Sequence, residues 1–477
     1  MKIASLFYVV STLIFLGGCN PTDNQKINDP PENETSAFEP VGVHPGSESN
    51  YDISLQLNEQ ELFTVDASIT VKNMSPDVWE ELSFYLIPNM FTEINSPELE
   101  KPSTVLIETI TLNNENAVFS LEKDHLSVEL NQNLEPNATV VVDVKYQFTL
   151  PEQGLRFTKN KENYFLAQWY PMLATYRNGG WNKEDYRFKG ETYHTAFSNF
   201  KLNYDIPNGL TIITSSDEDT YPSENNGDLE VEKVKEFYVA IIKKHNLIQK
   251  NNGDINVRVF GMDDSTDLHQ EVLQTASEAL DYFQKTIGPY PHKQLDIILE
   301  ELGMEYPGIV TAGSIYNTGP QQPEHLKSLV VHEIAHQWFY GIISNDPYHD
   351  AWLDEGFAGF ATFLFETEHN DNDFDFKLSQ EGLKETPLPV NLSIDEYTPE
   401  TQSSYIYGKS NAMLVKLFQV NGGKANSEKF LKTYFDYYQY KEVDSNEFAR
   451  FLKHYLELED DSIFKDWLQL KPAANPT

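Results

Sequence analysis

The chain contains the stretch VVHEIAHQW at residues 330–338, followed by AWLDEGFA at residues 351–358. His332 and His336 are four positions apart, and in an α-helix this spacing places both imidazoles on the same face. Two such histidines bind one metal ion, and Glu333 between them is placed to accept a proton from water. Catalytic zinc usually takes three protein ligands. The sequence therefore predicts a metal site on a helix, and this site needs a third ligand.

Glu355 is the candidate for that ligand, because eighteen residues separate it from His336. The pairing of the two stretches resembles the aminopeptidase N family of zinc metallopeptidases, gluzincins in which HEXXH is followed by eighteen residues and a ligand glutamate. The resemblance implies one Zn²⁺ per chain, bound by His332, His336 and Glu355. Asp354 stands where the family usually has asparagine, which alters the hydrogen bonds around the metal and keeps the ligand. The alternative is a lone HEXXH on a solvated helix face, and Glu355 argues against it.

The segment GMEYPG at residues 303–308 resembles a second motif of the family, the Gly-x-Met-Glu-Asn strand that binds the substrate backbone and its free α-amine. The resemblance implies that Gly303, Met304 and Glu305 bind substrate, with Glu305 on the amine. Tyr306 replaces the asparagine of the motif, and the glycine spacing is altered. Taken alone, a glutamate such as Glu305 is more often a surface carboxylate at a strand end, and the flanking motif favours the amine-binding role.

The segment YGKS at residues 407–410 resembles a third motif, Tyr-x-Lys-Gly, which supplies a catalytic tyrosine. The resemblance implies that the Tyr407 hydroxyl stabilises the oxyanion of the tetrahedral intermediate. Tyr405 is the competing residue, but its spacing to Lys409 is wrong for the motif. The three motifs run in the order of the family, and the resemblance covers roughly residues 50–470.

Other histidines do not fit this metal site. His325 lies seven residues before His332, about 10 Å away along a helix axis, which is too far to share the ion. His349 and His369 have no partner at ligand spacing, so both are expected on the surface.

The N-terminus has the pattern of an exported protein. Lys2 precedes an apolar run over residues 3–16, which ends at Gly17-Gly18-Cys19. This run is too short for a membrane span of about 20 residues and suits a signal peptide. It resembles a bacterial lipoprotein signal, which implies a signal peptide at residues 1–18 and a lipid on Cys19. The alternative is an ordinary secretory signal with an incidental cysteine.

Lipidation at Cys19 predicts a lipoprotein in the cell envelope of a bacterium, extracytoplasmic and anchored in the lipid bilayer. Cys19 is the only cysteine, so no internal disulfide forms. Residues 19–50 are polar and rich in Pro, Asn and Ser, and they are predicted to be a flexible tether.

The hydrophobic pattern after the tether has a period of two and later changes to a helical period. Residues 51–250 alternate apolar and polar side chains between turn signals, which predicts an N-terminal antiparallel β domain. Residues 251–477 read as helices and a strand, among them a helix over 409–420 and a capping box at residues 444–447. The resemblance implies that this part is a thermolysin-like α+β zinc catalytic domain. It also implies that the chain is a short form of the family, without the C-terminal helical domain of larger relatives. The aromatic segments at 169–171 and 179–181 are expected to pack in the interior, with a ligand surface as the alternative.

The net charge of −39 argues against a nucleic-acid partner, because phosphate binding needs a basic surface. The resemblance implies a zinc aminopeptidase that acts on peptides with a free N-terminus, through a zinc-activated water with Glu333 as general base. A zinc endopeptidase is the alternative if Glu305 does not contact the amine. The remaining alternative is a peptide-binding scaffold without turnover.

Overall fold

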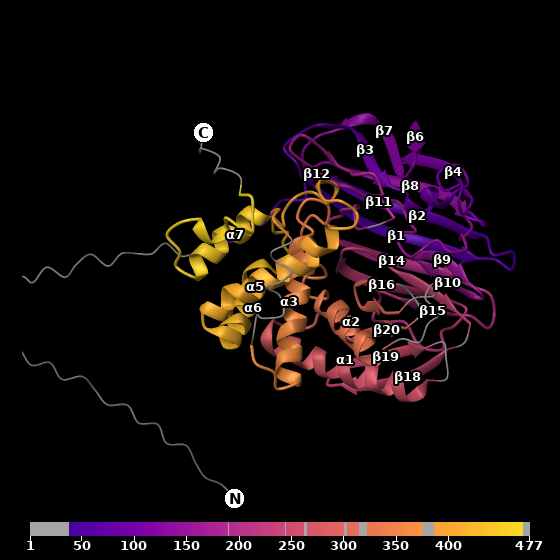
Figure 1. The fold of residues 1–477 in the computed structure, drawn as a ribbon. Coiled ribbons are helices and arrows are strands. Elements are labelled where there is room, and N and C mark those ends of the chain that lie inside the picture. The colour runs from indigo at the N-terminus through magenta and orange to yellow at the C-terminus, as the bar shows by residue number, and fades with distance from the viewer. Residues whose placement is uncertain are drawn as a thin grey trace, which may run out of the picture. The chain divides into compact units, whose positions relative to one another are not determined.

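The computed structural model describes residues 38–188, 190–243, 245–261, 265–299, 303–313, 322–374 and 386–470. The predicted signal peptide, Cys19 and most of the tether lie outside these residues. Pro40–Thr477 forms one unit, in which strands come first and helices follow (Figure 1). The predicted fold class, a β-rich region followed by an α+β region with the helices, is confirmed.

The largest sheet has seven strands and contains the N-terminal residues of the fold. Its order is β16 (Asn226–Val234), β14 (Ser198–Asp205), β1 (Ser47–Leu57), β2 (Phe63–Asn73), β8 (Thr139–Phe148), β4 (Val105–Leu112) and β5 (Glu115–Asn116). Alternate residues such as Ile53 and Leu55 are buried, and each aliphatic side chain removed from water contributes about 1.5–3 kcal/mol. The pairs are antiparallel except β1–β14, which is parallel.

Smaller sheets complete the β region. One has the order β15 (Thr211–Thr214), β17 (Val239–Ile242), β10 (Asn163–Leu166) and β9 (Phe157–Asn160), and another has β11 (Met172–Leu173), β3 (Trp79–Tyr85), β7 (His125–Leu134) and β6 (Phe119–Glu122). The strands β12 (Thr175–Arg177) and β13 (Gly180–Asn182) form a hairpin. Trp169 and Tyr170 are fully buried, and Trp181 packs on Trp79. The expectation of interior packing is therefore confirmed for residues 169–171, whereas residues 179–181 are exposed or half-buried.

The ordered fold begins earlier than the predicted end of the tether at residue 50. Strand β1 begins at Ser47, and Val43 forms a backbone bridge with Glu442. The prediction missed this start because residues 47–50 are polar, and β1 is held there by its ladder with β2 and not by apolar residues.

The C-terminal part is built on the sheet β18 (Asn246–Asn252), β19 (Ile255–Gly261), β20 (Gln294–Ile298) and β21 (Ile309–Thr311). Its helices are α1 (Thr266–Thr286), α2 (Pro323–Ala335), α3 (Trp352–His369), α5 (Ser410–Val420), α6 (Gly423–Tyr438) and α7 (Ser445–Tyr455). The predicted boundary between the two domains, at residues 250 and 251, falls inside strand β18. The division into two domains stays a prediction. Phe260, Ile298 and Tyr306 share a hydrophobic core with the β region, which ties the two parts together.

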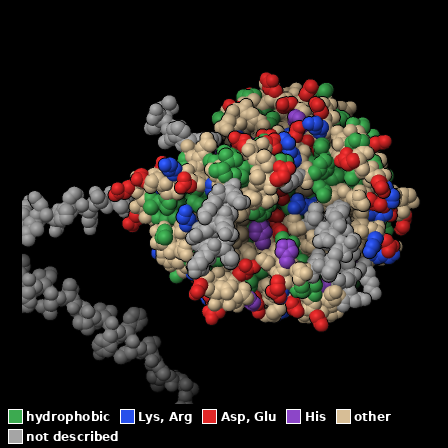
Figure 2. All heavy atoms as spheres, viewed as in Figure 1, with side chains coloured by type: hydrophobic (Ala, Val, Ile, Leu, Met, Phe, Trp, Pro, Cys, Tyr) green, Lys and Arg blue, Asp and Glu red, His purple; other side chains and the backbone are tan. Residues whose placement is uncertain are grey.

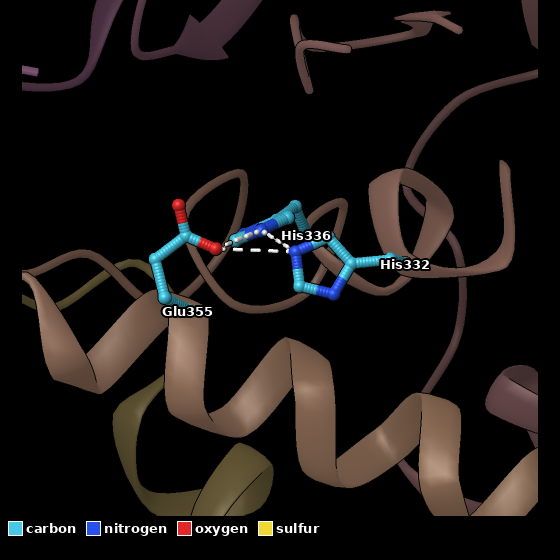
Figure 3. A group of neighbouring side chains, drawn as sticks. All are labelled: His332, His336 and Glu355. Carbon is cyan, nitrogen blue, oxygen red and sulfur yellow. Dashed lines mark hydrogen bonds and ion pairs between the residues drawn. The ribbon is translucent and has the colours of Figure 1, made fainter. Parts of the chain in front are cut away.

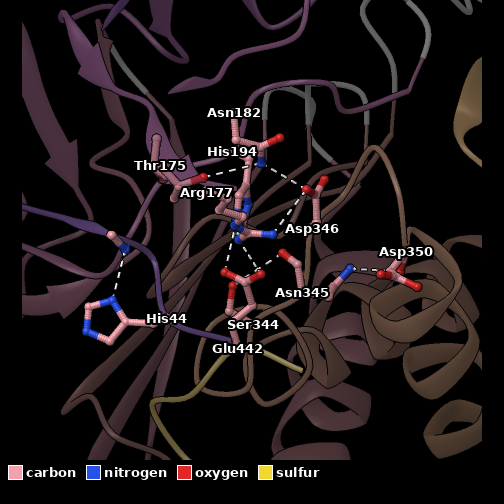
Figure 4. Close-up of polar contacts among 12 residues, drawn as sticks. His44, Thr175, Arg177, Asn182, His194, Ser344, Asn345, Asp346, Asp350 and Glu442 are labelled. Carbon is pink, nitrogen blue, oxygen red and sulfur yellow. Dashed lines mark hydrogen bonds and ion pairs between the residues drawn. The ribbon is translucent and has the colours of Figure 1, made fainter. Parts of the chain in front are cut away.

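A buried ionic network also joins the two parts (Figure 4). Arg177 in β12 donates to Glu442 and, at 3.4 Å, to Asp346, while His194 lies 3.0 Å from the Glu442 carboxylate. Burial opposes ionisation of Glu442, but His194 and Arg177 outweigh it and lower the pKa of Glu442. Removing one member of a buried ion pair costs about 3–5 kcal/mol, so this network fixes the β region against the loop that follows α2.

Candidate active site

Two helices supply the predicted metal ligands (Figure 3). His332 lies in the last turns of α2, His336 directly follows that helix, and Glu355 lies in the first turn of α3. Nε2 of His332 is 3.1 Å from Oε2 of Glu355, and Nε2 of His336 is 3.2 Å from both of these atoms. Gly356, the residue after Glu355, allows α3 to approach α5 closely, because a Cβ there would lie 2.8 Å from the Ser410 side chain.

The chemistry of these three atoms fits a bound cation. Nδ1 of His336 donates to the carbonyl oxygen of Phe339 at 2.9 Å, so in the neutral imidazole Nε2 carries a lone pair. That lone pair faces a second imidazole nitrogen and a carboxylate oxygen, an arrangement of acceptors that a cation stabilises. Tetrahedral ligands at the zinc distances of 2.0–2.1 Å lie about 3.3–3.4 Å apart, close to the separations seen here.

Glu333 is buried beside this triad and lines the same cavity. Burial and the neighbouring Glu305 carboxylate raise the pKa of Glu333 well above its ordinary value. The backbone of Gly303 lies directly against it, because a Cβ at this position would be 2.7 Å from Oε1 of Glu333. A side chain at position 303 would therefore displace the Glu333 carboxylate.

Glu305 is brought to the metal helix by a glutamine next to the second histidine. The Gln337 amide nitrogen donates to the carbonyl oxygens of Glu305 at 3.3 Å and Tyr306 at 3.0 Å, and its oxygen accepts from Gly308 N at 2.9 Å. The Glu305 carboxylate is buried and lies close to Glu333 and His336, with one ligand atom of each within 4.8 Å of the others.

The other two predicted substrate-binding residues, Gly303 and Met304, differ in whether they line the cavity. Gly303 lines the cavity, whereas the Met304 side chain is buried in the hydrophobic core. Met304 pairs through its backbone with Thr311, the last residue of β21. This pairing fixes the segment that carries Glu305.

Of the two tyrosines considered from the sequence, Tyr407 lies in the site. It belongs to a π-helical turn, Ser404–Lys409, and its ring centroid is 6.2 Å from that of His332. Its hydroxyl interacts with the Glu355 carboxylate, and 44% of its surface is exposed. Tyr405 is buried and stacks on Tyr397 at 4.9 Å, so it is a packing residue.

Asp354 and the remaining histidines lie around the site without joining the triad. Asp354 accepts from Asn345 Nδ2 at 3.0 Å and from the backbone of Glu355 at 2.7 Å, which holds the start of α3. His349 pairs with Asp346 at 3.0 Å and His369 with Glu278 at 3.3 Å, and both are 45% exposed. His325 lines the far end of the cavity.

The site opens into a cavity of about 700 Å³ between the β region and the helices. Figure 2 shows histidine side chains in the middle of this face, with acidic and basic side chains around them. The β region contributes Arg156 and Glu191 to the lining. Arg156 Nη2 donates to the Gly303 carbonyl at 2.7 Å, and Nη1 lies 3.9 Å from the Glu191 carboxylate. No sequence pattern indicated these two residues, because neither stands in a motif or at a set distance from one.

The chain is similar to known proteins in both sequence and fold. Residues 271–467 match the peptidase family M1 domain. Aminopeptidase N of Lactobacillus delbrueckii subsp. lactis is 21% identical over 394 residues, which cover 76% of this chain and 46% of that protein. Leukotriene A-4 hydrolase of Xenopus laevis is 24% identical over 398 residues, which cover 76% of this chain and 63% of that protein. The chain thus spans about half to two thirds of the length of these relatives.

Two solved structures have a similar fold. An M1 zinc metallopeptidase from Deinococcus radiodurans matches with a TM-score of 0.61 and 16% identity, over 92% of this chain and 98% of that chain. The yeast LTA4 hydrolase in complex with bestatin matches with a TM-score of 0.62 and 16% identity, over 93% of this chain and 71% of that chain. Similarity at this level of identity establishes a shared fold.

Proposed function

Because this chain belongs to peptidase family M1 through the domain at residues 271–467, we propose that it is a zinc aminopeptidase that removes N-terminal residues from peptides. The family resemblance found in the sequence is confirmed by that domain, and so is the zinc cofactor, which His332, His336 and Glu355 would hold. The observation that carries the proposal is the buried Glu305 carboxylate beside Glu333 and the metal ligands.

Glu305 is the group that separates an aminopeptidase from an endopeptidase. A buried carboxylate is costly unless a positive charge compensates it. The α-ammonium of a peptide supplies such a charge, and ion pairing at Glu305 places the first peptide bond over the metal ligands. Glu191, on the β-region side of the same cavity, adds a second carboxylate near this end. The arrangement favours a free N-terminus over an internal peptide segment.

Glu333 and Tyr407 carry the proton transfer and the charge stabilisation. Zinc, when bound, supplies Lewis acidity toward the scissile carbonyl and lowers the pKa of water to about 7. Glu333 accepts the proton of the attacking water and then passes it to the nitrogen of the departing amine. The Tyr407 hydroxyl donates a hydrogen bond to the developing oxyanion, and one such donor is worth about 3 kcal/mol.

The test compares peptides that differ only in an acetyl group on the N-terminus. Residues 20–477 loaded with zinc are expected to shorten the free peptides stepwise, as followed by mass spectrometry, and to leave the acetylated ones intact. Glu305→Gln is expected to lower kcat/KM on free peptides by about 10²–10³-fold, because it removes a buried charge-assisted contact. Glu324→Gln is the matched control, since Glu324 is 88% exposed and lies outside the cavity lining.

The other outcomes of this comparison identify the alternatives. Internal cleavage regardless of acetylation would establish an endopeptidase and remove Glu305 from the amine contact. Zinc binding without cleavage of either peptide would establish a binding protein without turnover. Unchanged kcat/KM in Glu305→Gln would contradict the role assigned to that residue even in an aminopeptidase.

The location of the enzyme is a separate proposal that rests on the sequence. We propose that Cys19 is lipidated and that the polar segment after it tethers the folded part to a bilayer in the cell envelope of a bacterium. Among the described residues, no helix has the length and hydrophobicity needed to cross a membrane. The full chain expressed in a bacterium is expected to partition into detergent and to incorporate labelled palmitate. Cys19→Ser is expected to lose the label, and a label retained in that variant would contradict the assignment.

A further inference from the structure

The cavity extends past the metal ligands along the groove between α2 and α3. The two helices run antiparallel, because Ser328, before His332 in α2, contacts Glu366, far beyond Glu355 in α3. The walls of this end of the cavity are formed by His325, Ser328, Thr362, Phe363, Glu366 and Asn411. It is the end opposite Glu305, which lies beside His336 at the C-terminal side of α2.

Glu366 is the acidic group of this end. It is half-buried, and its Oε1 accepts a hydrogen bond from Ser328 Oγ at 2.6 Å. Across the described residues, no lysine or arginine forms an ion pair with Glu366. The neighbouring acid on the same helix, Glu368, is exposed and pairs with Lys424 at 2.8 Å. Glu366 therefore differs from Glu368 in lining the cavity and in having no lysine or arginine paired with it among the described residues.

Asn411 provides a second and independent sign that this wall accepts a ligand. It lies one helical turn after Tyr407, and its side chain lies over Gly359 of α3. Its Oδ1 atom is buried and has no hydrogen-bond partner among the described residues. Buried polar atoms are nearly always paired in folded proteins. An N–H group of a bound peptide backbone is the donor that this position accommodates.

We propose that Glu366, with Ser328 and Asn411, forms a subsite for a lysine or arginine side chain of the leaving peptide. This inference rests on the proposed function. If the α-ammonium is held at Glu305 and the scissile carbonyl lies at the metal ligands, the rest of the peptide continues toward Glu366. An ammonium or guanidinium group then forms a charge-assisted hydrogen bond with a carboxylate that is partly shielded from water.

The distance along the groove selects which residues of the peptide reach this subsite. Ser328 precedes His332 by four residues, about 6 Å along the helix axis. An extended peptide advances about 3.3 Å per residue. The Glu366 carboxylate, held at Ser328, is therefore level with the first or second residue after the scissile bond.

The experiment measures kcat/KM for release of the N-terminal alanine from matched tetrapeptides, Ala-X-Ala-Ala and Ala-Ala-X-Ala, with X as Lys, Gln or Glu. The zinc-loaded chain is expected to prefer Lys over Glu at one of the two positions by about 30-fold or more, the equivalent of one charge-assisted contact. Glu366→Gln is expected to reduce this ratio to about threefold, and Glu366→Lys to reverse it. Glu368→Gln, two residues away on the same helix, is expected to keep the wild-type ratio.

The Glu368 control separates the subsite from the general effect of an acidic protein. A Lys-to-Glu ratio near one in the wild type, or a ratio that survives in Glu366→Gln, overturns the subsite while alanine release continues. If no tetrapeptide loses its alanine, the proposed aminopeptidase function fails and the subsite fails with it. The two failures are thus distinguished by whether the Gln peptides are cleaved.

Discussion

Glu333→Gln is expected to retain its zinc and to lose turnover by about 10³-fold or more, within the range typical of a missing general acid–base group. The amide keeps the size of the carboxylate, so the close contact with Gly303 is preserved. It cannot accept the proton of the attacking water or return it to the departing amine. The binding of zinc and of the peptide amine is carried by other residues, so KM is expected to change far less than kcat.

Measuring zinc content and kcat on the same preparation makes this prediction specific. A matched glutamate on the same helix, Glu324, is exposed, and Glu324→Gln is expected to keep wild-type turnover. A zinc-replete Glu333→Gln enzyme with wild-type kcat would disprove the role of Glu333 as general base. Loss of zinc together with turnover would instead assign Glu333 a part in holding the metal.

The residues predicted by local spacing lie where the sequence placed them. His332 and His336 share a helix face, which depends only on helix geometry. The helix predicted over residues 409–420 is α5, and Asp444 caps α7 by accepting from the backbone of Glu447 at 2.8 Å. Each of these features is decided within one or two helical turns.

Features set by contacts between distant segments escaped prediction. Arg156 and Glu191 come to the cavity from the β region, and Arg156 meets Gly303 across 147 positions of the chain. The parallel pair β1–β14 likewise depends on where the chain returns after residue 190. The residue pattern of a strand indicates that one of its faces is buried, but it does not determine which strand lies beside it. The GMEYPG segment was found through its motif, but the clamp by Gln337 that fixes it to the metal helix was not.

Removing the His336 imidazole is expected to have the largest effect on the metal. His336→Ala leaves two ligands, fewer than the three that a catalytic zinc site uses, and zinc content after dialysis is expected to fall from one ion per chain to below about 0.1. The affected position is well defined, because His336 is 1% exposed and its ring is oriented by the Phe339 carbonyl. Peptidase activity is expected to disappear with the metal.

His349→Ala is the matched control, because His349 is 45% exposed, pairs with Asp346 and is not one of the three predicted metal ligands. It is expected to keep both its zinc and its activity. The control matters because a buried histidine also contributes to packing, so thermal unfolding of His336→Ala must be measured beside its zinc content. Both groups of side chains that could hold a metal ion among the described residues contain His336. A folded His336→Ala chain that still binds one zinc ion tightly would therefore show that the metal is held at a different site.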